Sequence, residues 1–519
     1  MNSNQNASSA ILNIKTLGEL KAAGYQSRSV KTELRDNYIA KIRKNEPVFE
    51  GIWGYENTVI PELGRAILSM HNISLLGLRG QAKTRIARMM TELLDEYIPC
   101  IAGSELNDDP FAPLSRTARD LISAHGDDTP ISWLHRSERY TEKLATPDVS
   151  IADLIGDVDP IKAASLKLPY SDERVIHFGL IPRSNRGIFV INELPDLQAR
   201  IQVALFNILQ EGDIQIRGFK LRLPLDVQFV FTANPEDYTN RGSIVTPLKD
   251  RIESQIITHY PNDIPTSRKI TEQESAIKPG QSAIRVNDLS RNLIEQIAFE
   301  ARESEYVDSK SGVSARMTIT AFETMVSAAE LRTLLNNEEE THVRLSDLFN
   351  IIPAICGKVE LVYEGEIEGP ILVAHNLISR AVRVQFLQHF PDPAKFKKQN
   401  GNPYLKIMNW FEAGNQMDIF SDLKNNEYRA RLLAIDGLDE LVEKYTERVS
   451  QDEKLFLMEF VLHGMAECSL IGRQDIEKGV HFRDLMSTMF SGLGNDEFDD
   501  DDDNDEEDFD EDDDQENLF

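Results

Sequence analysis

The chain has 519 residues, too many for a single hydrophobic core, and this length indicates roughly three or four structural units. Hydrophobic residues make up 41% and charged residues 27%, as in soluble globular proteins, and no apolar run is long enough for a transmembrane helix. The net charge is −30, of which 17 negative charges follow residue 495, so the body is also acidic and lacks the basic face of a nucleic-acid-binding protein.

The ends of the chain and the cysteines indicate the compartment. The N-terminus is polar, without a basic segment leading into an apolar run, and predicts no signal peptide. Cys100, Cys356 and Cys468 lie far apart and form no CxxC pair, which argues against a disulfide framework or a zinc site. We therefore expect a cytoplasmic protein without nucleic-acid binding or membrane insertion.

The first part of the chain predicts a strand, a turn and a helix in succession. Residues 1–45 have helical spacing of apolar residues, and an amphipathic helix is expected to begin near Val59. Ile73–Leu76 is a short apolar run that predicts a buried strand, and a helix is expected from Lys83 to Tyr97. A strand, a glycine-bearing turn and a helix are the context of a phosphate-binding loop.

Two further apolar runs predict a parallel sheet. Residues 187–197 and 227–234 are expected to be buried strands, and between them lie a helix and a hairpin around Arg217-Gly218. Buried strands separated by helices predict a three-layer α/β domain with a parallel sheet.

The remainder is helical in pattern. Residues 262–285 are polar with two prolines and are interpreted as a hinge region. The predicted domains are an N-terminal helical segment (1–45), an α/β nucleotide-binding core (46–265), an all-α lid (286–368), a helical C-terminal extension (369–494) and a disordered acidic tail (495–519). The tail is interpreted either as a solubility device or as a docking segment for a basic surface.

The candidate phosphate-binding loop matches G-x-x-x-x-G-K-[ST] except at its second glycine. It consists of Gly77, Leu78, Arg79, Gly80, Gln81, Ala82, Lys83 and Thr84. Lys83 would neutralise phosphate charge and the Thr84 hydroxyl would bind Mg²⁺. Ala82 replaces the glycine, and alanine does not freely adopt positive φ. The loop therefore predicts ATP and Mg²⁺ as ligands, with weaker binding than a perfect motif gives.

Residues after the loop supply candidate catalytic groups. Asn192 and Glu193 follow a predicted strand, where Asn192 would support Mg²⁺ through water and Glu193 would act as the base that polarises the attacking water. Asn234 ends the next strand and would hold that water. Arg251 is a candidate arginine finger for a neighbouring subunit, and Arg316 would contact phosphates from the lid. Arg251 is also compatible with a surface salt bridge.

Several segments in order resemble one family. GLRGQAKT, residues 146–163, HFGLIPRSNRGIFVINELPDL, IQIRGFKLRLP, TANPEDYTNRG and LKDR resemble the AAA+ ATPases of the MoxR and magnesium-chelatase subunit I group, the helix-2-insert group, over roughly residues 45–335. The resemblance implies that Gly77–Thr84 is Walker A, Asn192-Glu193 Walker B, Asn234 sensor 1, Arg251 the arginine finger and Arg316 sensor 2. It also implies a homo-oligomeric ring, commonly a hexamer, and a partner with a von Willebrand factor A domain.

Three functions remain open at this point. The first is a MoxR-type ATPase that acts as a chaperone, remodelling a partner or assisting metal or cofactor insertion. The second is the motor subunit of magnesium chelatase, which couples ATP hydrolysis to Mg²⁺ insertion into protoporphyrin IX. The third is a nucleotide-gated scaffold with little hydrolysis, suggested by Asn192 and opposed by Glu193. A transcription activator is disfavoured, because the sequence has no GAFTGA loop and no C-terminal helix-turn-helix.

Overall fold

The computed structural model describes residues 12–216, 219, 222–235, 243–396, 401–446 and 449–485. The predicted acidic tail and the predicted Arg217-Gly218 turn lie outside the described residues. The chain forms two compact units. The first comprises Met1–Ser282, Asp288–Ser327 and Phe349–Ile378, and the second comprises Ala283–Asn287, Ala328–Leu348 and Ser379–Phe519.

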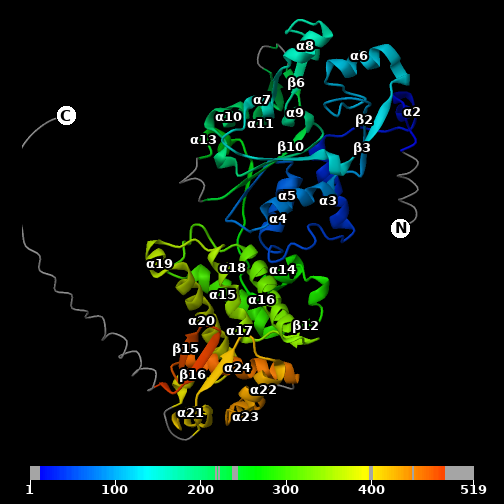
Figure 1. The fold of residues 1–519 in the computed structure, drawn as a ribbon. Coiled ribbons are helices and arrows are strands. Elements are labelled where there is room, and N and C mark those ends of the chain that lie inside the picture. Colours follow the sequence, from blue (N-terminus) through cyan, green and yellow to red (C-terminus); the bar gives the residue numbers. More distant parts are fainter. Residues whose placement is uncertain are drawn as a thin grey trace, which may run out of the picture. The chain divides into compact units, whose positions relative to one another are not determined.

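A five-stranded parallel sheet forms the centre of the first unit (Figure 1). Its order is β11 (Ser254–Ile257), β1 (Ile73–Leu76), β10 (Val227–Ala233), β7 (Gly187–Asn192) and β4 (Tyr140–Leu144). The three central strands are those that the apolar runs predicted. The predicted α/β fold with a parallel sheet is therefore confirmed. The two edge strands, β11 and β4, were not predicted from the sequence.

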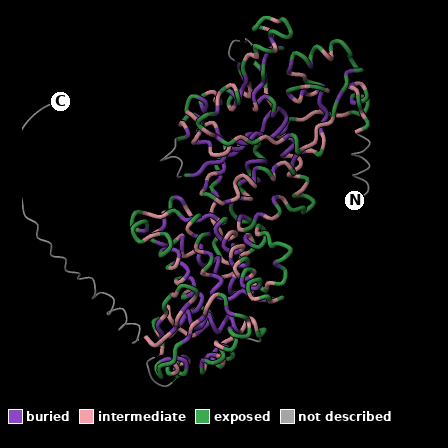
Figure 2. The backbone as a smooth tube through the Cα atoms, viewed as in Figure 1, coloured by how far each residue is buried: buried purple, intermediate pink, exposed green. Residues whose placement is uncertain are grey.

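The pleat of the central strands divides their side chains between two cores. Ile188 and Val190 of β7 pack into one cluster together with α3 (Val30–Arg43), α4 (Val59–Leu68) and α5 (Lys83–Met89). Phe189 and Ile191 point to the other face, where the cluster includes residues of α10 (Ala199–Ala204), α11 (Phe206–Glu211) and α13 (Thr246–Asp250). Because successive residues of a strand face opposite sides, an unbroken apolar run fits a strand that is covered on both faces. The buried centre is visible in Figure 2.

The N-terminal segment packs on this core. Beyond α2 (Leu17–Ala22), helix α3 contributes Val30 and Leu34 to the same cluster as β7 and β10. Its Glu33 carboxylate accepts two hydrogen bonds from the Arg139 guanidinium, at 2.6 and 2.7 Å, with both side chains almost fully buried. The boundary predicted at residue 45 thus falls inside a set of helices that share one core.

Short elements are inserted between the strands of the sheet. After α5, a 3-10 turn ends at Leu93 and β2 begins at Tyr97, so the helix predicted to continue to Tyr97 is shorter than expected. Antiparallel pairs join β2 to β3, β5 to β6 and β8 to β9, the last of these flanking the predicted hairpin turn. The elements are β2 (Tyr97–Ile101), α6 (Arg116–His125), β3 (Ile131–His135), α7 (Ile151–Leu154), β5 (Gly156–Val158), α8 (Pro160–Leu166), β6 (Ile176–Phe178), α9 (Leu180–Arg183), β8 (Asp213–Gln215) and β9 (Arg222–Pro224).

The hinge predicted for residues 262–285 is wrong over much of its length. It contains helix α14 (Ile264–Glu274), which begins at an Asp263 cap whose carboxylate accepts from the Thr266 amide at 2.8 Å, and which carries a proline in its first turn. Both are helix-start signals that the polar composition obscured. Helices α15 (Asp288–Glu303), α16 (Ala315–Asn336), α17 (Leu345–Leu348), α18 (Ile352–Cys356), α19 (Tyr363–Glu368) and α20 (Pro370–His389) follow.

The C-terminal region is helical but also contains a sheet that the sequence did not predict. A three-stranded antiparallel sheet has the order β14 (Met417–Phe420), β16 (Gly479–Arg483) and β15 (Gly472–Ile476). It accompanies the short parallel pair β12 (Ile284–Arg285) and β13 (Thr341–His342), and α21 (Leu405–Glu412), α22 (Asn425–Leu433), α23 (Leu438–Tyr445) and α24 (Gln451–Glu467). Among the described residues, every helix is too short or too polar to cross a bilayer.

Candidate functional site

The loop from Gly77 to Thr84 leaves β1 at the carboxyl end of the sheet and leads into α5. The Gly77 amide donates to the Ala233 carbonyl at 3.1 Å, which fixes the start of the loop beside β10. A Cβ at Gly77 would lie 2.0 Å from Thr258 Oγ1, and one at Gly80 would lie 2.2 Å from Ser314 Oγ. Glycine is therefore required at both positions because neighbouring side chains approach the backbone.

Ala82 has φ of 55° and ψ of 15°, the left-handed conformation that a glycine adopts without strain. The substitution therefore leaves the turn geometry in place, with the strain stored locally. The backbone still enters α5 at Lys83, so the loop leads directly into a helix N-terminus, where the first amide groups have no partner within the helix.

Buried side chains hold the loop from behind. The Tyr55 hydroxyl donates to the carbonyls of Gln81, at 3.1 Å, and His259, at 2.8 Å. Burial raises the pKa of Tyr55 to about 12, so the phenol remains protonated. Thr258 Oγ1 donates to Gln81 Oε1 at 2.7 Å. Neither residue belongs to a recognisable motif. Tyr55 contacts the Gln81 backbone and Thr258 the Gln81 side chain, and both lie far from the loop in sequence.

Lys83 points back across the loop toward the neighbouring strand. Its ammonium donates to the Gly77 carbonyl, to the Leu78 carbonyl at 2.8 Å and to Asn234 Oδ1 at 2.7 Å. Asn234 is buried at the end of β10. The candidate phosphate-binding lysine and the candidate sensor 1 residue are thus in direct contact, although 151 positions separate them.

Asn192 and Glu193 end β7 next to the same loop. Asn192 Oδ1 accepts from Thr84 Oγ1 at 3.4 Å and from Thr232 Oγ1 at 3.1 Å. The Glu193 amide donates to Thr232 Oγ1 at 3.2 Å, and Glu193 has φ of 56°, outside the usual range for a residue with a side chain. Thr232, on the adjacent strand, therefore orients both residues and is a further site residue that the sequence analysis missed.

One cavity of about 670 Å³ collects these groups, a size typical of ligand sites. It is lined by Arg79, Gly80, Gln81, Ala82, Lys83, Thr84, Arg85, Leu144, Asn192, Glu193, Thr232, Ala233, Asn234, Ile270, Glu274, Ala315, Arg316 and Ile319. Gly77 and Leu78 do not line it and contribute the carbonyls that Lys83 contacts.

Arg316 and Arg251 occupy different places. Arg316, at the start of α16, lines the cavity. Arg251 lies outside it, where its guanidinium donates to Gln210 Oε1 at 2.9 and 3.1 Å and stacks 5.1 Å from the centre of the Phe206 ring. Arg251 therefore does not line the cavity of its own chain, and its role across a subunit interface stays a prediction.

Arg316 of α16 was predicted to reach the site from the lid, but the apolar wall that α14 forms with α16 was not. Ile270 and Ile319 give an apolar patch, and Arg85 and Glu274 form an ion pair beside it. Apolar side chains next to polar groups suit a heterocyclic base, for which the phosphate-binding loop alone offers no apolar contact. The misassigned hinge explains why α14 was absent from the predicted site.

The donor set fits a magnesium ion that is held mainly by phosphate oxygens and water. Thr84 supplies a hydroxyl and Asn192 an amide oxygen, both oxygen ligands, but neither carries a charge. Within the described residues no cluster of three His, Cys, Asp or Glu side chains is arranged for a metal. A cation at this site therefore depends on the nucleotide that it accompanies.

Comparisons with known proteins agree with the geometry. The Sigma-54 interaction domain family matches residues 169–257, a segment that contains β7, β10 and β11. The magnesium-chelatase 38 kDa subunit of Cereibacter sphaeroides is 24% identical over 207 residues, covering 39% of this chain and 56% of that protein. The corresponding subunit of Rhodobacter capsulatus is 24% identical over 229 residues, covering 43% of this chain and 59% of that protein.

The aligned region spans little more than half the length of these curated relatives. A structure of the complex between subunits BchI and BchD of magnesium chelatase is 19% identical, with 62% of this chain and 98% of that chain covered and a TM-score of 0.33, a value that supports no conclusion. From the sequence relatives and the domain match, the chain is related to AAA+ ATPases of the magnesium-chelatase subunit I kind and to the AAA+ domains of sigma-54 activators.

Proposed function

We propose that the protein is an ATP-hydrolysing AAA+ motor of the MoxR type, acting as a chaperone that remodels a partner or assists metal or cofactor insertion. The observation that supports it is the meeting of Lys83, Thr84, Asn192, Glu193 and Asn234 around one cavity at the carboxyl ends of three adjacent strands. Such a site binds the phosphates, the magnesium ion and the attacking water of ATP hydrolysis.

Each group has one role in this proposal. Lys83 exchanges its contacts with the loop carbonyls and Asn234 for the β- and γ-phosphates. Thr84 and Asn192 hold Mg²⁺, the latter through water, and the ion supplies charge neutralisation when bound. Glu193 accepts a proton from the attacking water, Asn234 positions that water, and Arg316 contacts the phosphates from α16.

Partner and assembly are also part of the proposal. A homo-oligomeric ring, commonly a hexamer, would bring Arg251 of one subunit to the cavity of the next. A protein with a von Willebrand factor A domain would be the functional partner. An increase in the rate of phosphate release on addition of such a protein would support the MoxR hypothesis.

Magnesium chelatase is the second candidate, because its 38 kDa subunit is among the relatives of this chain. The two candidates share the ATPase residues and differ in their partner. Stimulation by a large porphyrin-binding subunit rather than by a von Willebrand protein alone would favour the chelatase. The sigma-54 match supports the AAA+ core only, since the sequence lacks a GAFTGA loop.

A comparison of three proteins tests the central proposal. Steady-state phosphate release and fluorescent ATP-analogue binding are measured with the wild type, Glu193→Gln and Lys83→Ala. We expect Glu193→Gln to bind nucleotide with at least about 100-fold slower turnover, in the range for losing a general base, and Lys83→Ala to lose binding. Wild-type turnover equal to that of Glu193→Gln would instead support the nucleotide-gated scaffold, and unchanged affinity in Lys83→Ala would refute the phosphate-binding loop.

A further inference from the structure

An exposed apolar surface lies on α19 and at the start of α20. Tyr363 is 72% exposed, Ile367 70%, Ile371 62% and Leu372 48%. The first three recur every four residues, and Gly369, with φ of 94°, joins the two helices between them. Glu364, Glu366 and Glu368 are interleaved with them and are exposed as well. We call these seven residues the α19 patch.

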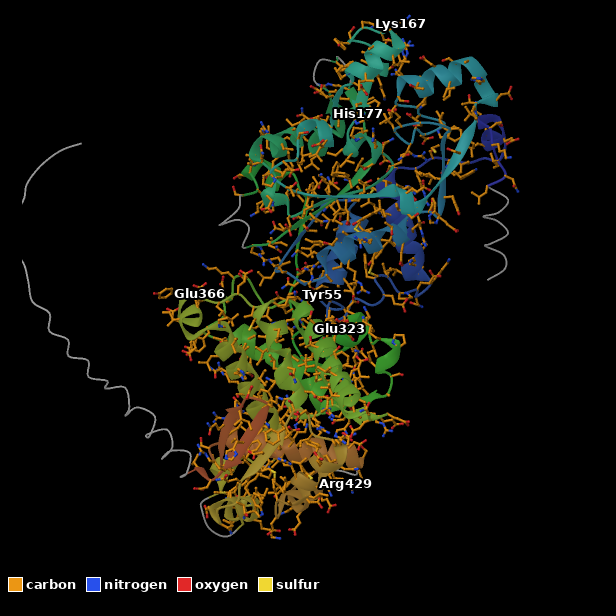
Figure 3. The ribbon with its side chains drawn as sticks, viewed as in Figure 1. Tyr55, Lys167, His177, Glu323, Glu366 and Arg429 are labelled. Carbon is orange, nitrogen blue, oxygen red and sulfur yellow. The ribbon has the colours of Figure 1, made fainter. Side chains whose placement is uncertain are left out.

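The patch is held rigidly from its inner side. Gly365 is buried, and a Cβ there would lie 2.5 Å from the Tyr306 carbonyl, so α19 packs directly on that backbone. The Val362 amide donates to the same carbonyl at 3.0 Å. The apolar side chains are therefore presented outward by fixed backbone, and Figure 3 shows Glu366 on the outside of this helix. Several exposed apolar side chains close together in the chain, on an element packed from its inner side, are typical of a binding surface.

Charge restricts what covers the patch. From Val359 to Ser379 the chain contains four glutamates and no Lys or Arg. An anionic membrane surface would be repelled by these carboxylates. A second copy of the same patch would also be repelled, because it carries the same three glutamates. A protein segment with apolar and basic residues is complementary in both respects.

Residues 306–312 connect the patch to the phosphate-binding loop. Val307 bridges to Leu361, and the Asp308 amide donates to the Glu360 carbonyl at 2.9 Å. At the other end of this segment, a Cβ at Gly312 would lie 2.7 Å from the Leu78 side chain, so the segment also packs against the loop.

A second link runs through side chains. Glu360 accepts from Arg79 Nη1 of the loop at 2.6 Å and from the Ser311 hydroxyl at 2.6 Å. The Ser311 hydrogen bond, and then the nearby Arg79, lower the pKa of Glu360 below its usual value, so the carboxylate is charged at neutral pH. Glu360 precedes Tyr363, the first patch residue, by three positions. A displacement of this segment would therefore move the carboxylate that pairs with Arg79.

We propose that the α19 patch docks a basic amphipathic helix of a partner protein and that docking changes nucleotide affinity through Glu360 and Arg79. The docking half of this proposal stands without the proposed ATPase function, whereas the coupling half rests on it.

A model helix tests the docking half. The probe is a fluorescein-labelled peptide of about 18 residues with a leucine face and a lysine face, and its counterpart carries glutamate in place of lysine. Anisotropy is measured at physiological ionic strength with the full-length wild type, Ile367→Glu/Ile371→Glu, and Leu334→Glu/Leu335→Glu, whose leucines are 68% and 66% exposed on α16. We expect the patch variant to bind the lysine peptide at least tenfold more weakly and the α16 variant to bind it as the wild type does.

Two further variants distinguish attraction of the lysine peptide to the patch from attraction to the overall negative charge of the protein. Glu364→Lys/Glu366→Lys/Glu368→Lys should weaken binding at least tenfold, whereas Asp501→Lys/Asp502→Lys/Asp503→Lys, with the same charge change in the acidic tail, should not. Equal loss in both, or equal binding by wild type and Ile367→Glu/Ile371→Glu, overturns the docking surface. A change of oligomeric state in the patch variant, seen by light scattering without any peptide effect, identifies a second copy as the occupant and also overturns it.

The coupling half is tested by ATP-analogue affinity with and without saturating lysine peptide. We expect a shift of at least threefold in the wild type and none in Glu360→Gln, which keeps the patch and should still bind the peptide. Peptide binding without a shift in the wild type refutes the coupling. Absence of nucleotide binding in the wild type alone refutes the ATPase proposal and leaves the docking result standing.

Discussion

Ala82 places a methyl group where the phosphate-binding loop turns left-handed. A non-glycine residue in this conformation costs about 1–2 kcal/mol relative to glycine, partly offset by the larger conformational entropy that glycine loses on folding. The loop nevertheless closes around Lys83, because Tyr55 and Thr258 hold Gln81 from behind. The departure from the motif therefore affects strain more than geometry.

Ala82→Gly should relieve this strain. We expect ATP-analogue binding to be retained and the free energy of unfolding to rise by about 0.5–1 kcal/mol, measured as an increase in the melting temperature of the unit that contains the sheet. Ala82→Val is the matched control and should have the opposite effect, since a β-branched residue is poorly tolerated at positive φ. A glycine variant less stable than wild type would show that the left-handed conformation is not strained.

His342 is a residue whose protonation should destabilise the second unit. It is 6% exposed, its Nε2 is without a hydrogen-bond partner among the described residues, and its Nδ1 lies 3.8 Å from Asp452. Burial, together with Arg344 and Arg332 and against the effect of Asp452, lowers its pKa from 6.5 to about 4. Since folding favours the neutral ring, its contribution to stability is complete above pH 6.5 and is lost as the pH falls toward 4.

The expected loss at pH 5 follows from this shift. The free energy of unfolding should be about 2 kcal/mol lower at pH 5 than at pH 7.5. The reason is that His342 has a pKa of 6.5 in the unfolded chain and of about 4 in the folded one. Melting temperatures at pH 7.5 and pH 5 should therefore differ less in His342→Gln than in the wild type, with His389→Gln, an exposed position, as the control. The same pH dependence in all three proteins would contradict this role for His342.

At the scale of elements, the N-terminal helix α3 is part of the core and not an appendage to it. Glu33 and Arg139 form a bidentate ion pair with side chains 3% and 1% exposed, joining α3 to the segment before β4. Asp226 adds a second link by accepting from the Val30 amide at 2.8 Å. Removing one partner of a buried pair leaves the other charge without compensation.

Glu33→Leu alone should therefore destabilise the first unit by about 3–5 kcal/mol. The double variant Glu33→Leu/Arg139→Met, which replaces both charges by apolar side chains, should recover most of that loss. Urea or thermal unfolding followed by tryptophan fluorescence measures both. If the double variant is as unstable as the single one, the loss does not come from the unpaired arginine.

The elements show how far a sequence predicts this fold. Strands β1, β7 and β10 were predicted because they are buried on both faces and so appear as largely apolar runs. Edge strand β4 (YTEKL) has no buried residue and β11 (SQII) has one, Ile256, so neither carries such a signal. Helix α14 is largely polar because much of it faces solvent, and the β14–β16 sheet alternates too briefly to be distinguished from loops.

The candidate site also contains some residues that the sequence predicts and others that only the fold reveals. Motif residues such as Lys83 and Glu193 have a recognisable spacing, and the cavity is lined by the predicted residues except Gly77, Leu78 and Arg251. Thr232, Tyr55 and Ile270 reach the site only through tertiary packing, and no local pattern marks them. What the sequence supplied was the chemistry of the phosphate end, whereas the supports behind the loop and the apolar wall required the fold.

At the scale of the whole molecule, Arg251 is the residue whose function depends on assembly. It lies outside the cavity of its own chain, held by Gln210 and stacked on Phe206, at the end of α13. If a ring brings it to a neighbour's phosphates, Arg251→Ala should keep nucleotide binding and lose turnover by about 10³-fold or more, as for other arginine fingers.

Mixing two inactive variants tests whether Arg251 acts on the cavity of a neighbouring subunit. Arg251→Ala subunits retain Glu193 in their own cavity, and Glu193→Gln subunits retain the arginine. In rings assembled at random from equal amounts, about a quarter of the interfaces would combine an intact cavity with an intact Arg251. Phosphate release near a quarter of the wild-type rate is therefore expected from the mixture and not from either variant alone. Inactivity of the mixture at every ratio, once exchange of subunits is verified, would contradict a role of Arg251 at the cavity of a neighbour. Its role would then lie within its own chain, where the side chain contacts Gln210, the Pro247 carbonyl and the Phe206 ring.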